Sequence, residues 1–356
     1  MDERDRRKER RNREKRIFIA SLCVLLCFVT VAAIAGIYLS RKLVSDTTED
    51  TMTEKTESST SFSVTEKMER ETAFSETDSE KKETESETEQ ANSISADITA
   101  TNAIVVEADS DLVLYQKDSR DQIAPASTAK MITALTALDV CPEEEEITVG
   151  AEIAMMNEDS SRAWLNQGDI LTVRQLLIAL MLPSGNDAAY ALAVHTGRKI
   201  SGDNSLADEQ AVGVFMDAVN KKARDLGAQN SNFVAPDGYD AEGQYTTASD
   251  LAVLAKACLE NPCIAEIVAS YISYEKWVND REVTYYNTNE LLNPDSSYYY
   301  PEAIGIKTGT SDLAGASLVS AAVINGKTYI SVVMGAATED SRFQDSITIY
   351  DAIKSL

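Results

Sequence analysis

The stretch AIGIKTGTSDLAGASLVSAAVINGKTYISVVMGA, residues 303–336, decides the fold of this 356-residue chain. It predicts three successive strands, AIGIKTGT, GASLVSAAVI and TYISVVMGA, because short apolar runs alternate with polar or glycine-containing breaks. Far upstream, AIVVEADSDLVLYQKD at residues 103–118 predicts two more strands joined by the turn Asp109-Ser110-Asp111. We expect the strands from both ends to share one mostly antiparallel sheet.

Helical patterns dominate the segment between these strands, and one more follows them. The predicted helices are STAKMITALTALDV (127–140), LTVRQLLIALML (171–182), NDAAYALAVH (186–195), DEQAVGVFMDAVNKKARDLG (208–227), TASDLAVLAKACLE (247–260) and DSRFQDSITIYDAIKSL (340–356). Pro183 stops the second helix, Asn186 or Asp187 is the expected N-cap of the third, and Gly227 ends the fourth. Strands at both ends around a helical middle predict an α+β fold.

The composition divides the chain into four parts. Residues 1–16 form a basic head, and residues 17–39 form an uncharged apolar run that is long enough to span a bilayer. Residues 45–96 are acidic and rich in Ser, Thr and Glu, which predicts a disordered tether. Residues 97–356 have the composition of a globular domain and are expected to carry the activity.

The first two parts predict an N-terminal transmembrane helix that serves as a signal anchor. The positive-inside rule places the basic head in the cytoplasm, so the chain is expected to be a single-pass cell-membrane protein. The tether and the catalytic domain then lie on the extracytoplasmic, cell-wall side. A cleaved signal peptide is the alternative, with Ala33-Ile34-Ala35 as a cleavage-like tripeptide.

Charge, histidine and cysteine content exclude several functions. The net charge of −25 argues against a nucleic-acid partner, because the chain would repel phosphates. His195 is the one histidine, which argues against a His-based metal site and indicates a surface histidine near a helix end. The globular part holds Cys141, Cys258 and Cys263, which are expected to be buried free thiols, with a Cys258–Cys263 disulfide as the alternative.

Ser127 and Lys130 stand three residues apart at the start of a predicted helix, and so on one face of it. A lysine in that position can approach the serine hydroxyl, and the helix N-terminus provides a positive field that favours a developing oxyanion. A lysine whose pKa is lowered by burial could act as general base for a serine nucleophile. An ordinary helix start remains the alternative for this pair alone.

Two later motifs complete a set. PSGN places Ser184 and Asn186 in a turn between helices, where they either form an N-cap loop or point into a cleft. KTGT continues a predicted strand with Lys307 and Thr308, and the missing Cβ of Gly309 would let another backbone approach closely. The alternative for KTGT is a strand end followed by a turn.

In this order, S-x-x-K, S-x-N and K-T-G are similar to the motifs of the penicillin-binding, serine-type D-Ala-D-Ala carboxypeptidases. The resemblance covers about residues 97–356 and extends to SNFVAPDGYD, TTASDLAVLA, NTNELL and SRFQDS. It implies the fold shared by penicillin-binding proteins and β-lactamases: a mostly antiparallel sheet flanked by helices, plus a helical subdomain. It also implies a role in cell-wall organisation, with no metal and no cofactor.

The resemblance further implies a role for each matching residue. Ser127 would attack the penultimate D-Ala carbonyl of a peptidoglycan stem peptide ending in D-Ala-D-Ala, and β-lactam antibiotics would acylate it covalently. Lys130 would be its general base and Ser184 a proton relay. The backbone N–H groups of Ser127 and Thr310 would stabilise the oxyanion. The substrate-binding residues would be Asn186, Lys307, Thr308, Gly309, Thr310 and Arg342.

Two alternatives to a carboxypeptidase remain. A serine β-lactamase would deacylate quickly with a glutamate in an E-x-x-L-N segment, whereas Glu290 lies three and not four residues before Asn293. A non-catalytic wall-binding scaffold of the same fold is the second alternative, although the motifs are intact.

Overall fold

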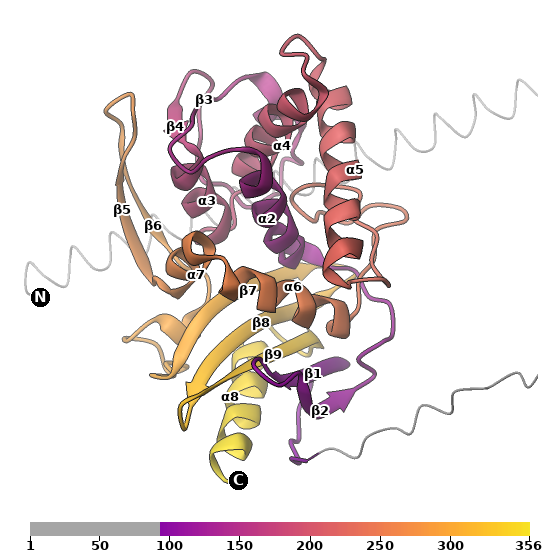
Figure 1. Ribbon diagram of the computed structural model, residues 1–356. Helices are drawn as coiled ribbons and strands as arrows, with labels where there is room; N and C mark the ends of the chain where they lie inside the picture. The colour runs from indigo at the N-terminus through magenta and orange to yellow at the C-terminus, as the bar shows by residue number, and fades with distance from the viewer. Residues whose placement is uncertain (1–92) are drawn as a thin grey trace, which may run out of the picture. The chain divides into compact units, whose positions relative to one another are not determined.

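The computed structural model describes residues 93–356 (Figure 1). The predicted basic head, the predicted transmembrane segment and almost all of the predicted tether lie outside these residues. Within the described part of the chain, no helix is both long and apolar enough to cross a membrane.

A five-stranded sheet forms the centre of the fold. Its order is β2-β1-β9-β8-β7, and every neighbouring pair is antiparallel. Asn102 of the first strand pairs with Met334 of the last, so the two ends of the globular domain share one sheet, as the sequence predicts. The strands are β1 (Asn102–Glu107), β2 (Leu112–Lys117), β7 (Ala303–Ser311), β8 (Gly315–Ile324) and β9 (Lys327–Ala336).

Helices cover both faces of this sheet (Figure 1). Successive residues of β8 point to opposite sides: Val319 belongs to the core beneath the large helical region, whereas Leu318 belongs to the core beneath the last helix. Phe343 and Tyr350 from that helix pack in the second core. Burial on both faces explains why β8 reads as a nearly continuous apolar run.

The predicted helices are present, with shifts of a few residues at most ends, but α4 continues six residues beyond the predicted end at His195. They are α2 (Lys130–Val140), α3 (Val173–Met181), α4 (Asn186–Ser201), α5 (Asp208–Leu226), α6 (Ala248–Glu260) and α8 (Ser341–Lys354). Gly227 follows α5 with a positive φ of 106°, as expected for the residue that ends a helix. The α+β prediction is therefore confirmed for the described residues.

Several short elements were not predicted. They are α7 (Pro262–Ala269), the hairpins β3 (Glu146–Thr148)/β4 (Ile170–Thr172) and β5 (Ile272–Lys276)/β6 (Glu282–Tyr286), and the 3-10 helices η1 (Ala126–Ala129), η2 (Ala151–Met155) and η3 (Glu290–Leu292). A three-residue strand is too short to show an alternating pattern. For α7 a signal was present, because the Asn261 side chain caps the helix and Pro262 starts it.

Two predictions about helix starts were wrong in detail. The N-cap of α4 is Gly185, and the Asp187 carboxylate instead accepts hydrogen bonds from the backbone N–H groups of Ala163 (2.9 Å) and Leu165 (3.0 Å). Ser127 lies in η1, a 3-10 turn that leads directly into α2, so it does not cap an α-helix. Because the 3-10 turn ends at Ala129, the α-helix begins at Lys130 and not at Ser127.

The cysteine prediction is confirmed. Cys141, Cys258 and Cys263 are free and buried. Each packs in the core between the sheet and the helices.

One buried carboxylate joins the start of the globular domain to its last helix. Asp345 of α8 accepts hydrogen bonds from Thr99 N (3.1 Å), Thr99 Oγ1 (2.9 Å) and Ala100 N (2.8 Å). Asp345→Ala should lower the free energy of unfolding by about 2 kcal/mol, because it leaves the buried N–H of Ala100 and the partly buried N–H of Thr99 without an acceptor. Urea unfolding of the full chain followed by circular dichroism measures this change. The control is Asp351→Ala, an exposed residue of the same helix, which should change stability by less than about 0.5 kcal/mol. Equal effects of the two substitutions would contradict the assignment.

Candidate active site

The three sequence motifs meet at one cavity of about 440 Å³. It lies between η1, the turn that joins α3 to α4, and the edge strand β7. Residues of all three motifs and of α8 line it: Ser127, Ser184, Asn186, Thr308, Gly309, Thr310 and Arg342. Lys130 and Lys307 are fully buried beside it.

The Ser127–Lys130 pair has the contact that its spacing predicts. Lys130 Nζ donates a hydrogen bond to Ser127 Oγ at 2.8 Å. Ser127 is half-buried at the cavity, whereas the Lys130 side chain is inaccessible to solvent. The arrangement therefore presents a hydroxyl to a bound molecule and keeps its partner amine away from water.

Two further acceptors hold the Lys130 amine. They are Asn186 Oδ1 (2.7 Å) and the backbone carbonyl of Asp237 (2.8 Å). Burial lowers the pKa of Lys130 from its ordinary value to about 8, and the nearby carboxylates of Asp237 and Asp187 oppose that shift. With this pKa roughly one tenth of Lys130 is neutral at pH 7, far more than for an ordinary lysine, so Lys130 is suited to accept a proton from Ser127.

The two polar residues of the PSGN turn, Ser184 and Asn186, differ in their hydrogen bonds. Ser184 has a positive φ of 64°, and its buried Oγ, which faces the cavity, has no hydrogen-bond partner within residues 93–356. A hydroxyl in that position is free to take part in proton transfer with a bound substrate. Asn186 is already engaged, since its Oδ1 accepts from Lys130 and its Nδ2 donates to Asp237 Oδ2 at 2.6 Å.

The KTGT strand passes close to η1, as the sequence predicts from Gly309. A Cβ added to Gly309 would lie 3.2 Å from both Ala126 Cβ and Thr128 Cγ2. Any larger residue would therefore push β7 and the Ser127 turn apart. The short contact fixes the width of the cavity between them.

Lys307 and Thr308 of β7 bring an amine and a hydroxyl to the strand beside the cavity. Lys307 Nζ donates to the backbone carbonyl of Thr308 at 3.0 Å, and Thr308 Oγ1 shares a hydrogen bond with Thr288 Oγ1 at 2.6 Å. Burial lowers the pKa of Lys307 well below its ordinary value, and the positive charges of Lys130 and Arg342 add to the effect. An anionic ligand would relieve this concentration of positive charge.

Arg342 reaches the end of the cavity from α8. Its Nη1 donates to Thr310 Oγ1 (2.7 Å) and to the backbone carbonyl of Gly309 (3.2 Å), and its Nη2 forms an ion pair with Glu339 (3.5 Å). The structure thus brings together all nine residues that the sequence singled out, while their roles stay predictions.

Asp237 is a site residue to which the sequence analysis assigned no role. Its carboxylate accepts from Asn186 Nδ2 and from the backbone N–H of Tyr239 (3.0 Å), while its carbonyl accepts from Lys130. The loop packs tightly against η1, because a Cβ on Gly238 would lie 1.9 Å from the carbonyl oxygen of Ala126. The Asp-Gly pair in SNFVAPDGYD was the available signal, but it does not reveal which residues the loop contacts.

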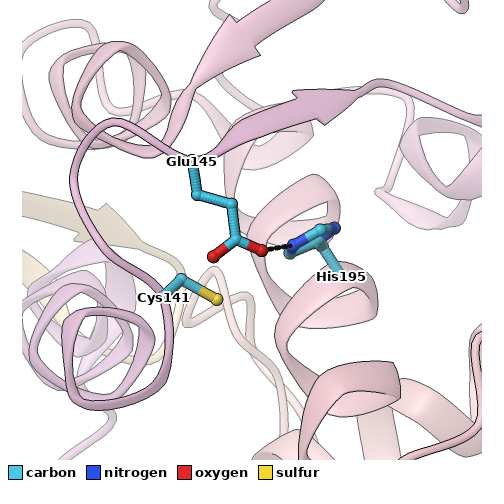
Figure 2. A group of neighbouring side chains, drawn as sticks. All are labelled: Cys141, Glu145 and His195. Carbon is cyan, nitrogen blue, oxygen red and sulfur yellow. Dashed lines mark hydrogen bonds and ion pairs between the residues drawn. The ribbon is translucent and has the colours of Figure 1, made fainter.

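Two other residues that the sequence analysis discussed, His195 and Glu290, lie away from the cavity. His195 of α4 does not line it and instead interacts with Glu145 (Nε2 to Oε1, 2.8 Å), so no Ser-His-Asp triad forms with Ser127 (Figure 2). Glu290 of η3 also does not line the cavity, and its Oε2 accepts from Asn293 Nδ2 at 2.9 Å. The position of Glu290 argues against the deacylating glutamate expected of a β-lactamase.

Comparison with known proteins agrees with this geometry. The sequence profile of the Peptidase S11 family, described as D-alanyl-D-alanine carboxypeptidase, matches residues 85–338. The D-alanyl-D-alanine carboxypeptidase DacF of Bacillus subtilis (strain 168) is 32% identical over 248 residues, which cover 68% of this chain and 59% of DacF. This chain thus spans little more than half the length of that relative.

Relatives of more similar length give the same family. The D-alanyl-D-alanine carboxypeptidase of Streptomyces sp. (strain K15) is 33% identical over 249 residues, which cover 66% of this chain and 80% of that protein. The crystal structure of the Streptomyces K15 DD-transpeptidase matches with a TM-score of 0.67 and 30% identity, covering 73% of this chain and 98% of that one. This likeness supports the penicillin-binding-protein/β-lactamase-like fold that the sequence resemblance implies.

A substitution of Asp237 tests how the site controls the pKa of Lys130. Asp237→Asn removes a negative charge that raises the pKa of Lys130, so that pKa should fall further below about 8. If Ser127 is the residue that a penicillin acylates, the rate of its reaction with a fluorescent penicillin should then begin to rise at a lower pH than in the wild type. Stopped-flow fluorescence between pH 5 and 10 measures the shift.

The matched control is Asp240→Asn. Asp240 also lines the cavity, but its carboxylate accepts from Ser311 Oγ (2.7 Å) and Leu313 N (3.1 Å), away from Lys130. This substitution should leave the pH at which the rate rises unchanged. An unshifted profile in Asp237→Asn, or equal shifts in both variants, would contradict the role given to Asp237.

Proposed function

Because the chain belongs to the Peptidase S11 family of D-alanyl-D-alanine carboxypeptidases, we propose that it removes the terminal D-Ala from peptidoglycan stem peptides. The reaction proceeds through an acyl-enzyme on Ser127, and β-lactams acylate the same hydroxyl. The observation that carries this proposal is the 2.8 Å contact between Ser127 Oγ, at the cavity, and the fully buried Nζ of Lys130.

Acylation begins with proton transfer from Ser127 Oγ to neutral Lys130 Nζ. The Oγ atom forms a bond to the carbonyl carbon of the penultimate D-Ala, giving a tetrahedral intermediate whose oxyanion accepts from the backbone N–H groups of Ser127 and Thr310. The C–N bond then breaks, and the leaving D-Ala amine takes up the proton, with the unpartnered Ser184 hydroxyl as relay. An ester on Ser127 remains.

Deacylation repeats these steps with water. Lys130 accepts a proton from a water molecule whose oxygen forms a bond to the ester carbonyl carbon. The bond between that carbon and Ser127 Oγ then breaks, and Lys130 returns the proton to Oγ. The product is a stem peptide shortened by one D-Ala. The K15 relative is called a DD-transpeptidase. An assay of D-Ala release should therefore include an amine acceptor, which would compete with water for the acyl-enzyme if transpeptidation occurs.

The cations explain how the substrate carboxylate is bound. Lys307, Arg342 and the hydroxyls of Thr308 and Thr310 gather at the β7 end of the cavity. A terminal carboxylate placed there accepts charge-assisted hydrogen bonds and offsets positive charge that burial makes unfavourable. Asn186 holds Lys130 and, through its position at the cavity, contributes to binding the substrate amide.

The location follows from the same substrate. Peptidoglycan stem peptides are cross-linked outside the membrane, and the basic head 1–16 and apolar run 17–39 support an N-terminal anchor. Residues 45–92 act as the tether. Residues 93–96, predicted as its end, instead pack on the domain, where Ile94 is buried and its N–H donates to Leu114 O, so the catalytic domain on the cell-wall side includes them. This topology suits a role in cell-wall organisation and cell shape.

The nucleophile is tested by Ser127→Ala. This substitution should abolish both the covalent penicillin adduct and D-Ala release from diacetyl-Lys-D-Ala-D-Ala, a loss of about 10⁴-fold or more, because no other group can form the ester. Intact-protein mass spectrometry and a D-Ala assay measure the two activities. Ser110→Ala, on the exposed β1–β2 turn, is the control and should behave as wild type.

Different results separate the alternative functions. An unchanged rate of D-Ala release in Ser127→Ala would refute the assignment of the nucleophile. Absence of any adduct in the wild type would favour the scaffold, and hydrolysis of penicillin within seconds at high turnover would favour a β-lactamase.

Lys130→Arg should acylate very slowly, since arginine stays protonated near neutral pH.

The pKa of Lys130 gives a pH prediction. With a pKa of about 8, neutral Lys130 becomes more abundant as the pH rises, so the acylation rate should increase about tenfold per unit below pH 8 and level off above it. Second-order rate constants for penicillin acylation between pH 5 and 10 give this profile. A rate that falls as the pH rises through 8 would mean that protonated Lys130 is the active form.

A further inference from the structure

A second cluster of chemically active side chains lies outside the cavity. Figure 2 shows Cys141, Glu145 and His195, whose Sγ, carboxylate oxygen and ring nitrogen all lie within 4.8 Å of one another. They come from three places: the C-cap of α2, the loop before β3, and α4. The proposed reaction uses none of them, and none lines the cavity at Ser127.

The donor atoms suit a zinc-like ion. One thiolate, one imidazole and one carboxylate form a set of ligands that Zn²⁺ accepts in tetrahedral sites, with a water molecule as the fourth ligand. With ligand bonds of about 2.0 Å, tetrahedral geometry separates the nitrogen and oxygen by about 3.3 Å. His195 Nε2 and Glu145 Oε1 are 2.8 Å apart and would need to separate by about half an ångström. Cys141 Sγ lies within 4.8 Å of both atoms and would need to approach to about 3.5 Å.

The surroundings allow an ion to enter and retain it. The side chains of Glu145 and His195 are 25% and 31% exposed, which leaves one side of the cluster open to solvent and to a water ligand. Cys141 is buried beneath them, and its Sγ has a weak contact with Thr196 Oγ1 at 3.7 Å. That hydroxyl can donate a hydrogen bond to a metal-bound thiolate without moving far.

Lys199 is the competing cation. Its ammonium pairs with Glu145 Oε2, whereas His195 interacts with Oε1, so the two partners use different carboxylate oxygens. An ion at Oε1 can therefore bind while Lys199 stays paired with Oε2. Zn²⁺ binds cysteine as a thiolate, so metal binding would release the Cys141 proton.

We propose that Cys141, Glu145 and His195 bind one Zn²⁺ or a similar borderline-soft divalent cation. The ion would lie away from the Ser127 cavity, because Cys141 and His195 lie roughly 15 Å further along α2 and α4 than Lys130 and Asn186, at 1.5 Å per residue. A bound ion ties α2 and the following loop to α4. It therefore stabilises the relative placement of the two helices that carry Lys130 and Asn186.

Cobalt(II) titration of the metal-free full chain tests the site directly. One equivalent of Co²⁺ should give a thiolate-to-metal charge-transfer band in the near ultraviolet, and Zn²⁺ should displace it. Cys141→Ser should remove the band, and His195→Gln should weaken binding at least tenfold, since even partners of metal ligands contribute about 10–100-fold. Cys258→Ser, another buried free thiol, is the matched control and should keep both band and affinity.

Thermal unfolding gives a second, independent measurement. One equivalent of Zn²⁺ should raise the midpoint of the wild type and of Cys258→Ser, because the ion binds the folded chain preferentially, and should not raise that of Cys141→Ser. Lys199→Gln should bind Zn²⁺ at least as tightly as the wild type, since it removes a competing cation. Circular dichroism confirms that each variant is folded before titration.

Several results would overturn the proposal. They are the absence of a charge-transfer band in the wild type, a band that survives Cys141→Ser, or an affinity unchanged by His195→Gln. Any of these would leave the cluster as an ion-pair network of His195, Glu145 and Lys199 beside a buried thiol. Because the measurement is spectroscopic, it is independent of whether the chain releases D-Ala.

Discussion

The buried amine of Lys130 is the contact on which the rest of the site depends. It joins Ser127 Oγ, Asn186 Oδ1 and the carbonyl of Asp237, so that one nitrogen connects η1, the α3–α4 turn and the loop before α6. Burying a lysine is costly unless each of its donors has an acceptor, and three are present here. Any change in the relative position of these three segments would leave a donor unpaired. The same burial lowers the pKa of Lys130 to about 8, so stability and chemistry depend on one arrangement.

The position of Lys130 at the start of α2 adds to this effect. Because Ser127 lies in a 3-10 turn, Lys130 is the first residue of the α-helix, where the helix macrodipole is positive. A positive helix end disfavours the ammonium form and favours an oxyanion nearby. The sequence predicts a helix start at Ser127, whereas the α-helix begins at Lys130, so the local field acts on the base as well as on the nucleophile.

The sequence could predict features that depend on neighbouring residues or on a repeating pattern of apolar residues. The i, i+3 relation of Ser127 to Lys130 and the five strands of the sheet are of this kind, as is the need for glycine at 309. It could not show that the Asp237 carboxylate orients Asn186, because that contact depends on a loop far away in the chain. Gly185 as the N-cap of α4 was missed for a related reason: Asp187 satisfies the backbone of residues 163 and 165 instead of its own helix. Residues 1–92, which carry the anchor and tether predictions, lie outside the described part of the chain.

The same argument applies to Cys141, Glu145 and His195. A single histidine counts against a metal site when ligands are sought as a spaced motif, yet three elements bring three different donor types together. Helices α2 and α4 begin with Lys130 and Asn186 at the Ser127 cavity, whereas Cys141 follows the last residue of α2 and His195 lies in the second half of α4. A link between the far ends restricts sliding or rotation of one helix against the other. The Lys130–Asn186 hydrogen bond joins these two helices at the cavity, and an ion bound by the second cluster would join them again further along.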